Sequence, residues 1–143
     1  KINMETELTE YLRIITQASY SRVEERLEKY GLVKGQANLL VLIRDNDGCT
    51  QKDLAEALGV KYSSMSERLN KLEALGYVER SVDESNSKYK RIYMTTAGKM
   101  AAVQCRRIQN EFEEIMYKGF AKKDVKQLET YLKKVCDNIA KYQ

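Results

Sequence analysis

Histidine and proline are both absent from this chain of 143 residues. Without histidine, Ser-His-Asp and Cys-His catalysis are excluded, and so are the commonest zinc sites. The three cysteines, Cys49, Cys105 and Cys136, are odd in number and far apart, so they form neither a metal knuckle nor an evident disulfide framework. The absence of proline lets helices run long without kinks. We therefore expect no catalytic residues, no metal site and no cofactor.

The chain also lacks an apolar run of membrane-spanning length and an opening secretory signal pattern. Hydrophobic residues make up 43% and charged residues 32%, as in soluble globular proteins and unlike disordered ones. The net charge of +4 and the isoelectric point near 8.9 suit binding to a polyanion without establishing it. We expect a single domain over residues 1–143 that lies in the cytoplasm, with no membrane partner.

The segment 49–96 carries the strongest pattern in the chain. A helix is expected from Thr50, which can cap it together with Asp53, and a turn at Leu58–Val60 leads to a second amphipathic helix over Tyr62–Leu75. Two β-like runs follow at residues 77–81 and 90–95, joined by a polar tip at residues 83–88. A helix-turn-helix places its second helix where it can enter a major groove, and a hairpin behind it supplies a wing. Residues 32–96 are therefore predicted to form a winged helix-turn-helix lobe.

The second helix of this lobe has two different faces. Apolar residues such as Met65 and Leu69 form an inward stripe, and small hydroxyls and cations lie opposite. A merely solvated face could look similar, but the wing that follows favours contact with double-stranded DNA. We expect contacts with base edges from Tyr62, Ser63, Ser64, Ser66 and Arg68, and contacts with phosphates from Lys61 and Lys71. The DNA backbone should be held through N–H groups and side chains of Thr50, Gln51 and Lys52. The expected contacts of the wing come from Lys88, Lys90 and Arg91.

Helical periodicity also marks both ends of the chain, at residues 5–30, 34–45, 97–118 and 123–142, with Thr96 able to cap the third of these helices. The first helix and the last two carry more apolar surface than a lone winged helix could cover. A helical bundle in a two-fold homodimer would bury it, so residues 1–30 and 97–143 are the expected dimerisation region. The alternative is a monomer with these helices folded onto the lobe. The predicted fold class is mainly α with a small β-hairpin wing (α+β).

This layout resembles the MarR family of bacterial and archaeal transcriptional regulators over nearly the whole chain. The most specific matching stretches are Gln51–Val60 (QKDLAEALGV), Leu69–Arg80 (LNKLEALGYVER) and Met94–Gly98 (MTTAG). The resemblance implies a homodimer whose recognition helices enter successive major grooves of a pseudo-palindrome, about one turn of DNA apart. A ligand-responsive regulator, and a repressor in particular, is thus the leading hypothesis.

Two positions depart from the family pattern. Glu67 stands where family members commonly carry arginine; a carboxylate there could accept from a cytosine amino group or orient Arg68 or Lys71. The family's Asp-x-Arg wing motif corresponds to Asn86 and Lys88, and lysine lacks the planar fork of arginine. Base preference and affinity are affected by these departures, but not the class of protein.

The resemblance further implies regulation by a small, often aromatic or anionic, effector in a crevice between the dimer helices and the lobe. Tyr11, Arg13, Tyr20, Arg22 and Tyr30 could line that crevice, although packing at helix junctions explains the tyrosines equally well.

Redox sensing is the family's other route, but the first helix holds no cysteine. Cys49 stands at a helix entrance, where the dipole could favour a thiolate, yet free cysteine is also a common core filler. Besides a ligand-responsive regulator, two hypotheses remain: a thiol-responsive regulator, and a winged-helix module for protein–protein contact, which Glu67 would suit. An enzyme is the weakest hypothesis, because no nucleophile–base pair is present.

Overall fold

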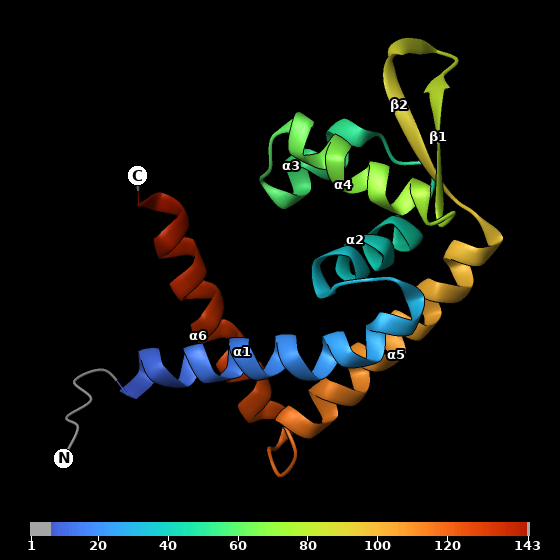
Figure 1. Cartoon of the computed structure of the whole chain (residues 1–143). Coiled ribbons are helices and arrows are strands. Elements are labelled where there is room, and N and C mark those ends of the chain that lie inside the picture. The colour runs from blue at the N-terminus through green and yellow to red at the C-terminus, as the bar shows by residue number, and fades with distance from the viewer. Residues whose placement is uncertain (1–6, 143) are drawn as a thin grey trace. The chain divides into compact units, whose positions relative to one another are not determined.

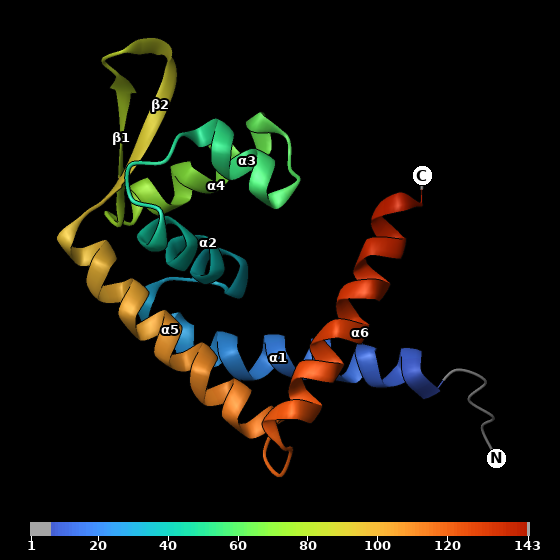
Figure 2. The same cartoon turned by 180° about the vertical axis from the view of Figure 1, so that it is seen from behind.

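The computed structural model describes residues 7–142, apart from the side chain of Ser87. The expected mainly α fold with a β-hairpin wing is confirmed (Figures 1 and 2). The elements in order are α1 (Glu7–Leu27), the short 3-10 helix η1 (Glu28–Tyr30), α2 (Lys34–Asp45), α3 (Gln51–Leu58), α4 (Tyr62–Ala74), β1 (Val78–Asp83), β2 (Asn86–Met94), α5 (Thr96–Met116) and α6 (Lys122–Lys141). The chain divides into two compact units, residues 1–109 and 110–143, with the boundary inside α5.

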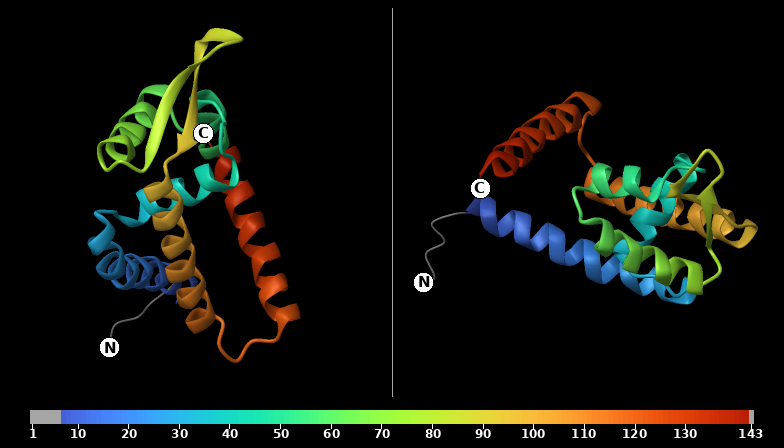
Figure 3. Two further views of the ribbon diagram at one scale, coloured as in Figure 1. Left: turned by 90° about the vertical axis from the view of Figure 1, so that its right-hand side faces the viewer. Right: turned by 90° about the horizontal axis from the view of Figure 1, so that it is seen from above.

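The first unit is built on an apolar core shared by α2, α3 and α4. Leu40 and Ile43 of α2, Leu54 of α3 and Leu69 of α4 are each at most 3% exposed. α1 joins this core through the C-terminal part of its length and runs without a kink, as the lack of proline allows (Figure 3). At its end η1 stops at Gly31, whose φ of 71° is a left-handed cap that glycine adopts without strain.

A reciprocal capping box starts α3, as the spacing of Thr50 and Asp53 predicts. The Thr50 hydroxyl accepts from the Asp53 N–H at 3.0 Å, and the Thr50 N–H donates to the Asp53 carboxylate at 3.3 Å. These two bonds satisfy N–H groups that have no partner within the helix. The cap therefore defines where the helix-turn-helix begins.

The strands of the wing are longer than predicted and extend into the polar tip expected at residues 83–88. β1 and β2 pair antiparallel from Val78↔Met94 to Asp83↔Asn86, which leaves only two residues at the turn. Two side-chain oxygens organise this end: Asp83 accepts from the Ser85 N–H at 3.0 Å, and Asn86 accepts from the Lys88 N–H at 3.1 Å. Local bonds of this kind stabilise a tight turn that polarity alone does not reveal.

The start of α5 is joined to the base of the wing. The Thr95 hydroxyl accepts from the Gly98 N–H at 2.9 Å and donates to the Gly76 carbonyl at 2.6 Å, and the Thr95 N–H donates to the Tyr77 carbonyl at 3.1 Å. Thr95 thus caps α5, so the prediction that Thr96 is the cap is wrong by one residue. Gly98 lies so close to the wing that a Cβ built on it would fall 1.9 Å from the Tyr77 carbonyl oxygen.

The second unit contains the end of α5, a turn with Gly119 at φ 87°, and α6. Tyr117 and Phe120 meet edge to face across the turn, with ring centroids 6.4 Å apart. The predicted helical stripe on α6 is present at residues 125, 128, 132, 135 and 139, but none of the residues in α6 is buried. This apolar stripe remains uncovered in the single chain.

Candidate nucleic-acid interface

The surface of α4 has a buried face and an outward face. Met65, Leu69 and Leu72 are fully buried, which confirms the predicted inward stripe, whereas Leu75 just beyond the helix is 40% exposed. The residues predicted to contact DNA lie away from the core: Lys61, Tyr62, Ser63, Arg68 and Lys71 are exposed, as is Glu67, and Ser64 and Ser66 are half-buried. Hydroxyls, two cations and one carboxylate thus form the outward surface of this helix, and that mixture can donate to and accept from base edges.

At the N-terminus of α3 the three predicted contact residues have different surroundings. The Lys52 side chain is exposed, with its ammonium 5.8 Å from the centre of the Tyr89 ring and 3.9 Å from the Glu56 carboxylate. The Thr50 hydroxyl is engaged in the cap. Gln51 is only 1% exposed, so the prediction that its side chain contacts DNA is corrected: the side chain points inward, where its carbonyl oxygen lies 3.5 Å from the Arg80 guanidinium.

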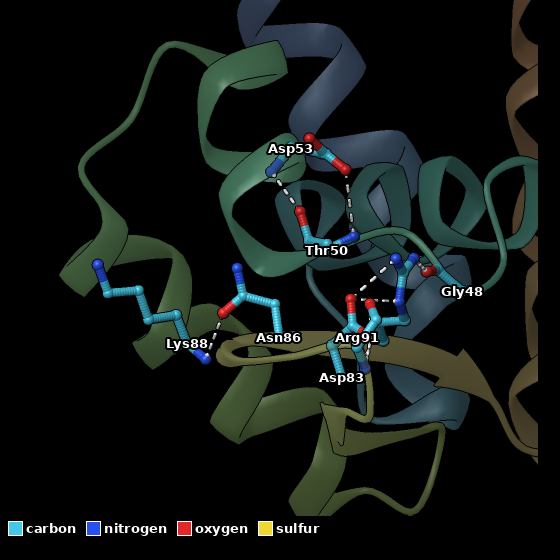
Figure 4. A network of polar contacts seen from close by, with 8 residues as sticks. Gly48, Thr50, Asp53, Asp83, Asn86, Lys88 and Arg91 are labelled. Carbon is cyan, nitrogen blue, oxygen red and sulfur yellow. Dashed lines mark hydrogen bonds and ion pairs between the residues drawn. The ribbon is translucent and has the colours of Figure 1, made fainter.

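The wing presents two exposed cations, Lys88 and Lys90, at the predicted positions. Arg91 differs, because its guanidinium is bonded within the protein. It donates to the Gly48 carbonyl at 2.8 Å and pairs with the Asp83 carboxylate at 3.0 Å (Figure 4). These bonds hold the wing against the segment before α3, and the backbone bond from Ile92 N–H to the Cys49 carbonyl at 2.8 Å adds to them. In the single chain Arg91 therefore braces the wing; its side chain is still 39% exposed, and the DNA contact expected from it stays a prediction.

A cavity of about 380 Å³ opens between the start of α3 and the wing. Its walls include the carboxylates of Asp53, Glu56 and Asp83 as well as the cations of Lys52 and Arg91. Asp83 accepts hydrogen bonds from Ser85 and Arg91, and these bonds lower the pKa of its carboxyl. The cavity therefore presents charges of both signs, with three carboxylates beside two cations.

The surroundings of Cys49 and Cys105 do not favour a thiolate. Burial, followed by the nearby Asp53 carboxylate, raises the pKa of the half-buried Cys49 thiol. Desolvation and a like charge thus oppose the thiolate that the helix dipole could favour at Cys49, which supports a packing role, and the redox role stays a prediction. Burial raises the pKa of Cys105 to about 11, in agreement with a packing role. Cys136 is exposed on α6.

Of the five residues predicted for an effector crevice, Tyr30 lines a cavity of the first unit. Tyr30 borders a hollow of about 250 Å³ together with residues of α1 and α5 that include Gln104 and Arg107. Arg13 instead bonds to Glu10 and Gln17 on its own helix. The remaining predicted residues, Tyr11, Tyr20 and Arg22, are exposed on α1, with the Lys34 ammonium 5.0 Å from the Tyr20 ring centre.

Within residues 7–142 no group of three or more acidic or cysteine side chains is arranged to hold a metal ion. None of the described helices is both long and apolar enough to cross a membrane.

Comparison with known proteins gives consistent matches. The profile of the MarR family matches residues 34–88. The chain is 32% identical over 108 residues to the uncharacterized HTH-type transcriptional regulator YybA of Bacillus subtilis (strain 168), covering 76% of this chain and 72% of that protein. The structure of the present chain is similar to that of the transcriptional regulator SlyA, with a TM-score of 0.83, 28% identity and 94% coverage of each chain. A MarR family transcriptional regulator from Listeria monocytogenes complexed with a 26mer DNA has a TM-score of 0.82 and 27% identity, covering 94% of this chain and 89% of that one.

Proposed function

Because this chain belongs to the MarR family of transcriptional regulators, we propose that it acts as a homodimeric repressor on a pseudo-palindromic operator and is released from DNA by a small effector. The observation that supports the proposal most is the outward face of α4. Its hydroxyls and cations lie on the side of the helix away from the fully buried stripe. The helix belongs to a capped helix-turn-helix and is followed by a wing. The similar regulator from Listeria monocytogenes is itself complexed with DNA.

In the proposed complex, α4 enters a major groove. Ser63, Ser64 and Arg68 face base edges, while Lys61 and Lys71 meet phosphates at the two ends of the helix. On the wing Lys88 and Lys90 approach the neighbouring DNA backbone, because their side chains are exposed. Each phosphate contact would release roughly one counterion, so binding should weaken steeply with salt.

The proposed homodimer would cover apolar surface that the single chain leaves open. On α1 Leu8 is 69% and Ile14 48% exposed, and on α6 Ile139 is 67% exposed. Large apolar side chains exposed on a helix in this way are typical of surfaces that associate in soluble proteins. We assign dimerisation to residues 1–30 and 97–143 and DNA binding to residues 32–96. A two-fold axis then sets two copies of α4 about one helical turn of DNA apart.

Regulation by a small aromatic or anionic effector is part of the proposal. The hollow beside Tyr30, with the Arg107 guanidinium on its wall, offers an aromatic edge and a cation at one place. A ligand that prefers one spacing of the recognition helices would change DNA affinity through a coupling of about 1–3 kcal/mol. A thiol switch at Cys49 is less favoured, because the pKa of that thiol is raised. Since genomic DNA is the target, the proposed location is the cytoplasm.

A winged-helix module for protein–protein contact is the second candidate function. Its support is Glu67, an exposed carboxylate with Ser63 and Lys71 one turn away on either side. In a groove this carboxylate would repel phosphates, whereas on a protein partner it could pair with a cation. The two functions differ in whether any duplex is bound selectively.

Fluorescence anisotropy with the DNA that flanks the protein's own gene separates these functions. The titration is run at 50 and 200 mM salt with the wild type, Arg68→Ala and Lys88→Ala; Lys126→Ala, which removes an exposed cation from α6, serves as the control. We expect salt-sensitive binding that exceeds binding to a scrambled duplex, weakened by both lobe variants and unchanged in Lys126→Ala. Equally weak binding to both duplexes by an intact dimer would favour the protein-contact module.

A further inference from the structure

Arg80, in the middle of β1, connects the wing to both helices of the helix-turn-helix. Its side chain is only 12% exposed. The guanidinium bonds to the Glu73 carboxylate at 3.1 Å and to the Asn70 amide oxygen, both on α4. Longer contacts of 3.5 Å reach the Ser66 hydroxyl on α4 and the Gln51 carboxamide on α3. One side chain of β1 thus contacts both α3 and α4.

The partners of Arg80 occupy one side of α4. Ser66, Asn70 and Glu73 are spaced by four and three residues, so they form a row along the helix. The buried row Met65, Leu69 and Leu72 runs beside it. With one side held by the core and the next by Arg80, the rotation of α4 about its own axis is determined. The outward row that remains is Ser63, Glu67 and Lys71.

The bonding geometry suits arginine specifically. Its planar fork carries several N–H donors in fixed directions, so it can serve Glu73, Asn70 and Gln51 at once, while lysine offers a single point charge. Gln51 is 1% exposed, and no buried side-chain polar atom of the described residues lacks a partner. Loss of the fork would leave the Gln51 oxygen without a donor that reaches it, and α4 would lose one of its two lateral supports.

The guanidinium itself is poorly placed to bind DNA. It is largely covered, and its charge is balanced by Glu73, whose pKa is lowered by the hydrogen bond from Arg80. A residue that holds the recognition helix without touching the duplex affects where base-reading groups lie more than how many phosphates are neutralised.

We propose that Arg80 is a positioning residue that sets the rotation of α4, and thereby the sequence discrimination of the regulator, without contacting DNA. This inference rests on the proposed function, since it concerns how the DNA-reading face is held. It also reassigns Gln51 and Ser66, both predicted from sequence to contact DNA, to the internal support of that face.

The test compares Arg80→Lys with Arg106→Lys as a matched control. Both changes keep the net charge and remove one guanidinium; Arg106 lies on α5, outside the lobe of residues 32–96, and pairs with Asp45 at 3.3 Å. The probes are the duplex that the wild type selects from a random-sequence library and a scrambled duplex of the same composition. We expect Arg80→Lys to lower the ratio of the two affinities about tenfold, an effect of about 1.4 kcal/mol. Its affinity for the scrambled duplex and its salt dependence should match the wild type, as should every property of Arg106→Lys.

Two results of the binding experiment would overturn the inference. One is an unchanged affinity ratio in Arg80→Lys. The other is an equal fall in both affinities that follows a lower melting temperature, because that is the behaviour of a residue with a purely structural role. Amide hydrogen exchange on the DNA-free protein gives a second reading: exchange should accelerate in α4 and stay unchanged in α2, and unchanged exchange in α4 would also refute the role of Arg80. If the wild type selects no sequence at all, the proposed function fails, while the exchange measurement still decides whether Arg80 holds α4.

Discussion

Replacing Gly98 by alanine tests the close approach of α5 to the base of the wing. In most exposed helix positions this change is stabilising, because alanine loses less conformational entropy than glycine on folding. At Gly98 the new Cβ would fall 1.9 Å from the Tyr77 carbonyl oxygen and 2.8 Å from the carbonyl carbon. That carbonyl accepts the Thr95 N–H at 3.1 Å, so it cannot move without breaking a bond at the junction.

The size of the effect follows from these opposing contributions. To reach a tolerable 3.0 Å the Cβ and the oxygen must separate by about 1.1 Å, and both belong to the backbone. Overpacking of this kind costs about 1–3 kcal/mol, and the loss of the Thr95 bond adds about 1 kcal/mol. The helix propensity of alanine returns about 1 kcal/mol. We therefore expect Gly98→Ala to reduce the free energy of unfolding by about 2 kcal/mol.

Urea denaturation at a fixed protomer concentration measures this change, because association contributes to the apparent stability of a dimer. With a slope of about 2 kcal/mol per M, the midpoint should fall by about 1 M. Gly35→Ala in α2 is the matched control: nothing lies within 4 Å of its Cβ position, so it should unfold at the same or a higher urea concentration than the wild type. A Gly98→Ala protein as stable as Gly35→Ala would refute the close approach.

Three further predictions concern the cap, the thiol and an ion pair. Thr50→Ala should cost about 1 kcal/mol in urea denaturation, because the Asp53 N–H loses its acceptor, while Thr50→Ser should stay near the wild type; equal losses in both would argue against the cap. At pH 7 Cys49 should be alkylated more slowly than a free thiol, since its pKa is raised above the ordinary 9.0, and mass mapping that finds faster alkylation would contradict this. The pKa of Glu73 is lowered below its ordinary 4.5. Its contribution to stability is therefore present above pH 4.5 and is lost as the pH falls through the folded-state pKa. Acid titration of Glu73→Gln should show a smaller loss of stability in that window, and a titration identical to that of the wild type would exclude the ion pair with Arg80 as the source of the loss.

Local signals in the sequence predict much of the lobe. The bounds of α2 agree with the expected residues 34–45. The apolar periodicity lies within this segment and the polar link follows it directly, so both signals are local. The Thr50–Asp53 cap forms as predicted, since both bonds join residues three apart. The inward stripe of α4 is confirmed for the same reason: three- and four-residue spacing alone determines which side chains share a helix face.

Side-chain partners that are distant in sequence could not be predicted in this way. Gln51 looks like an exposed first-turn residue, yet it is buried because Arg80, 29 residues later, supplies its donor. Arg91 looks like a wing cation, yet its donors are bound to Asp83 and to the Gly48 carbonyl, 43 residues earlier. The only sequence signal for Arg80 is a charged residue within a short β-like run, and a solvated strand gives the same pattern.

Hydroxyl-radical footprinting of the protein on the duplex it selects tests the central proposal most directly. A homodimer that inserts two copies of α4 should protect two segments related by a two-fold axis, with centres about 10 base pairs apart, and Lys88→Ala should weaken protection at the outer flanks where the wings lie. Protection of a single unsymmetrical segment, or of none at concentrations where the dimer is intact, would contradict the account.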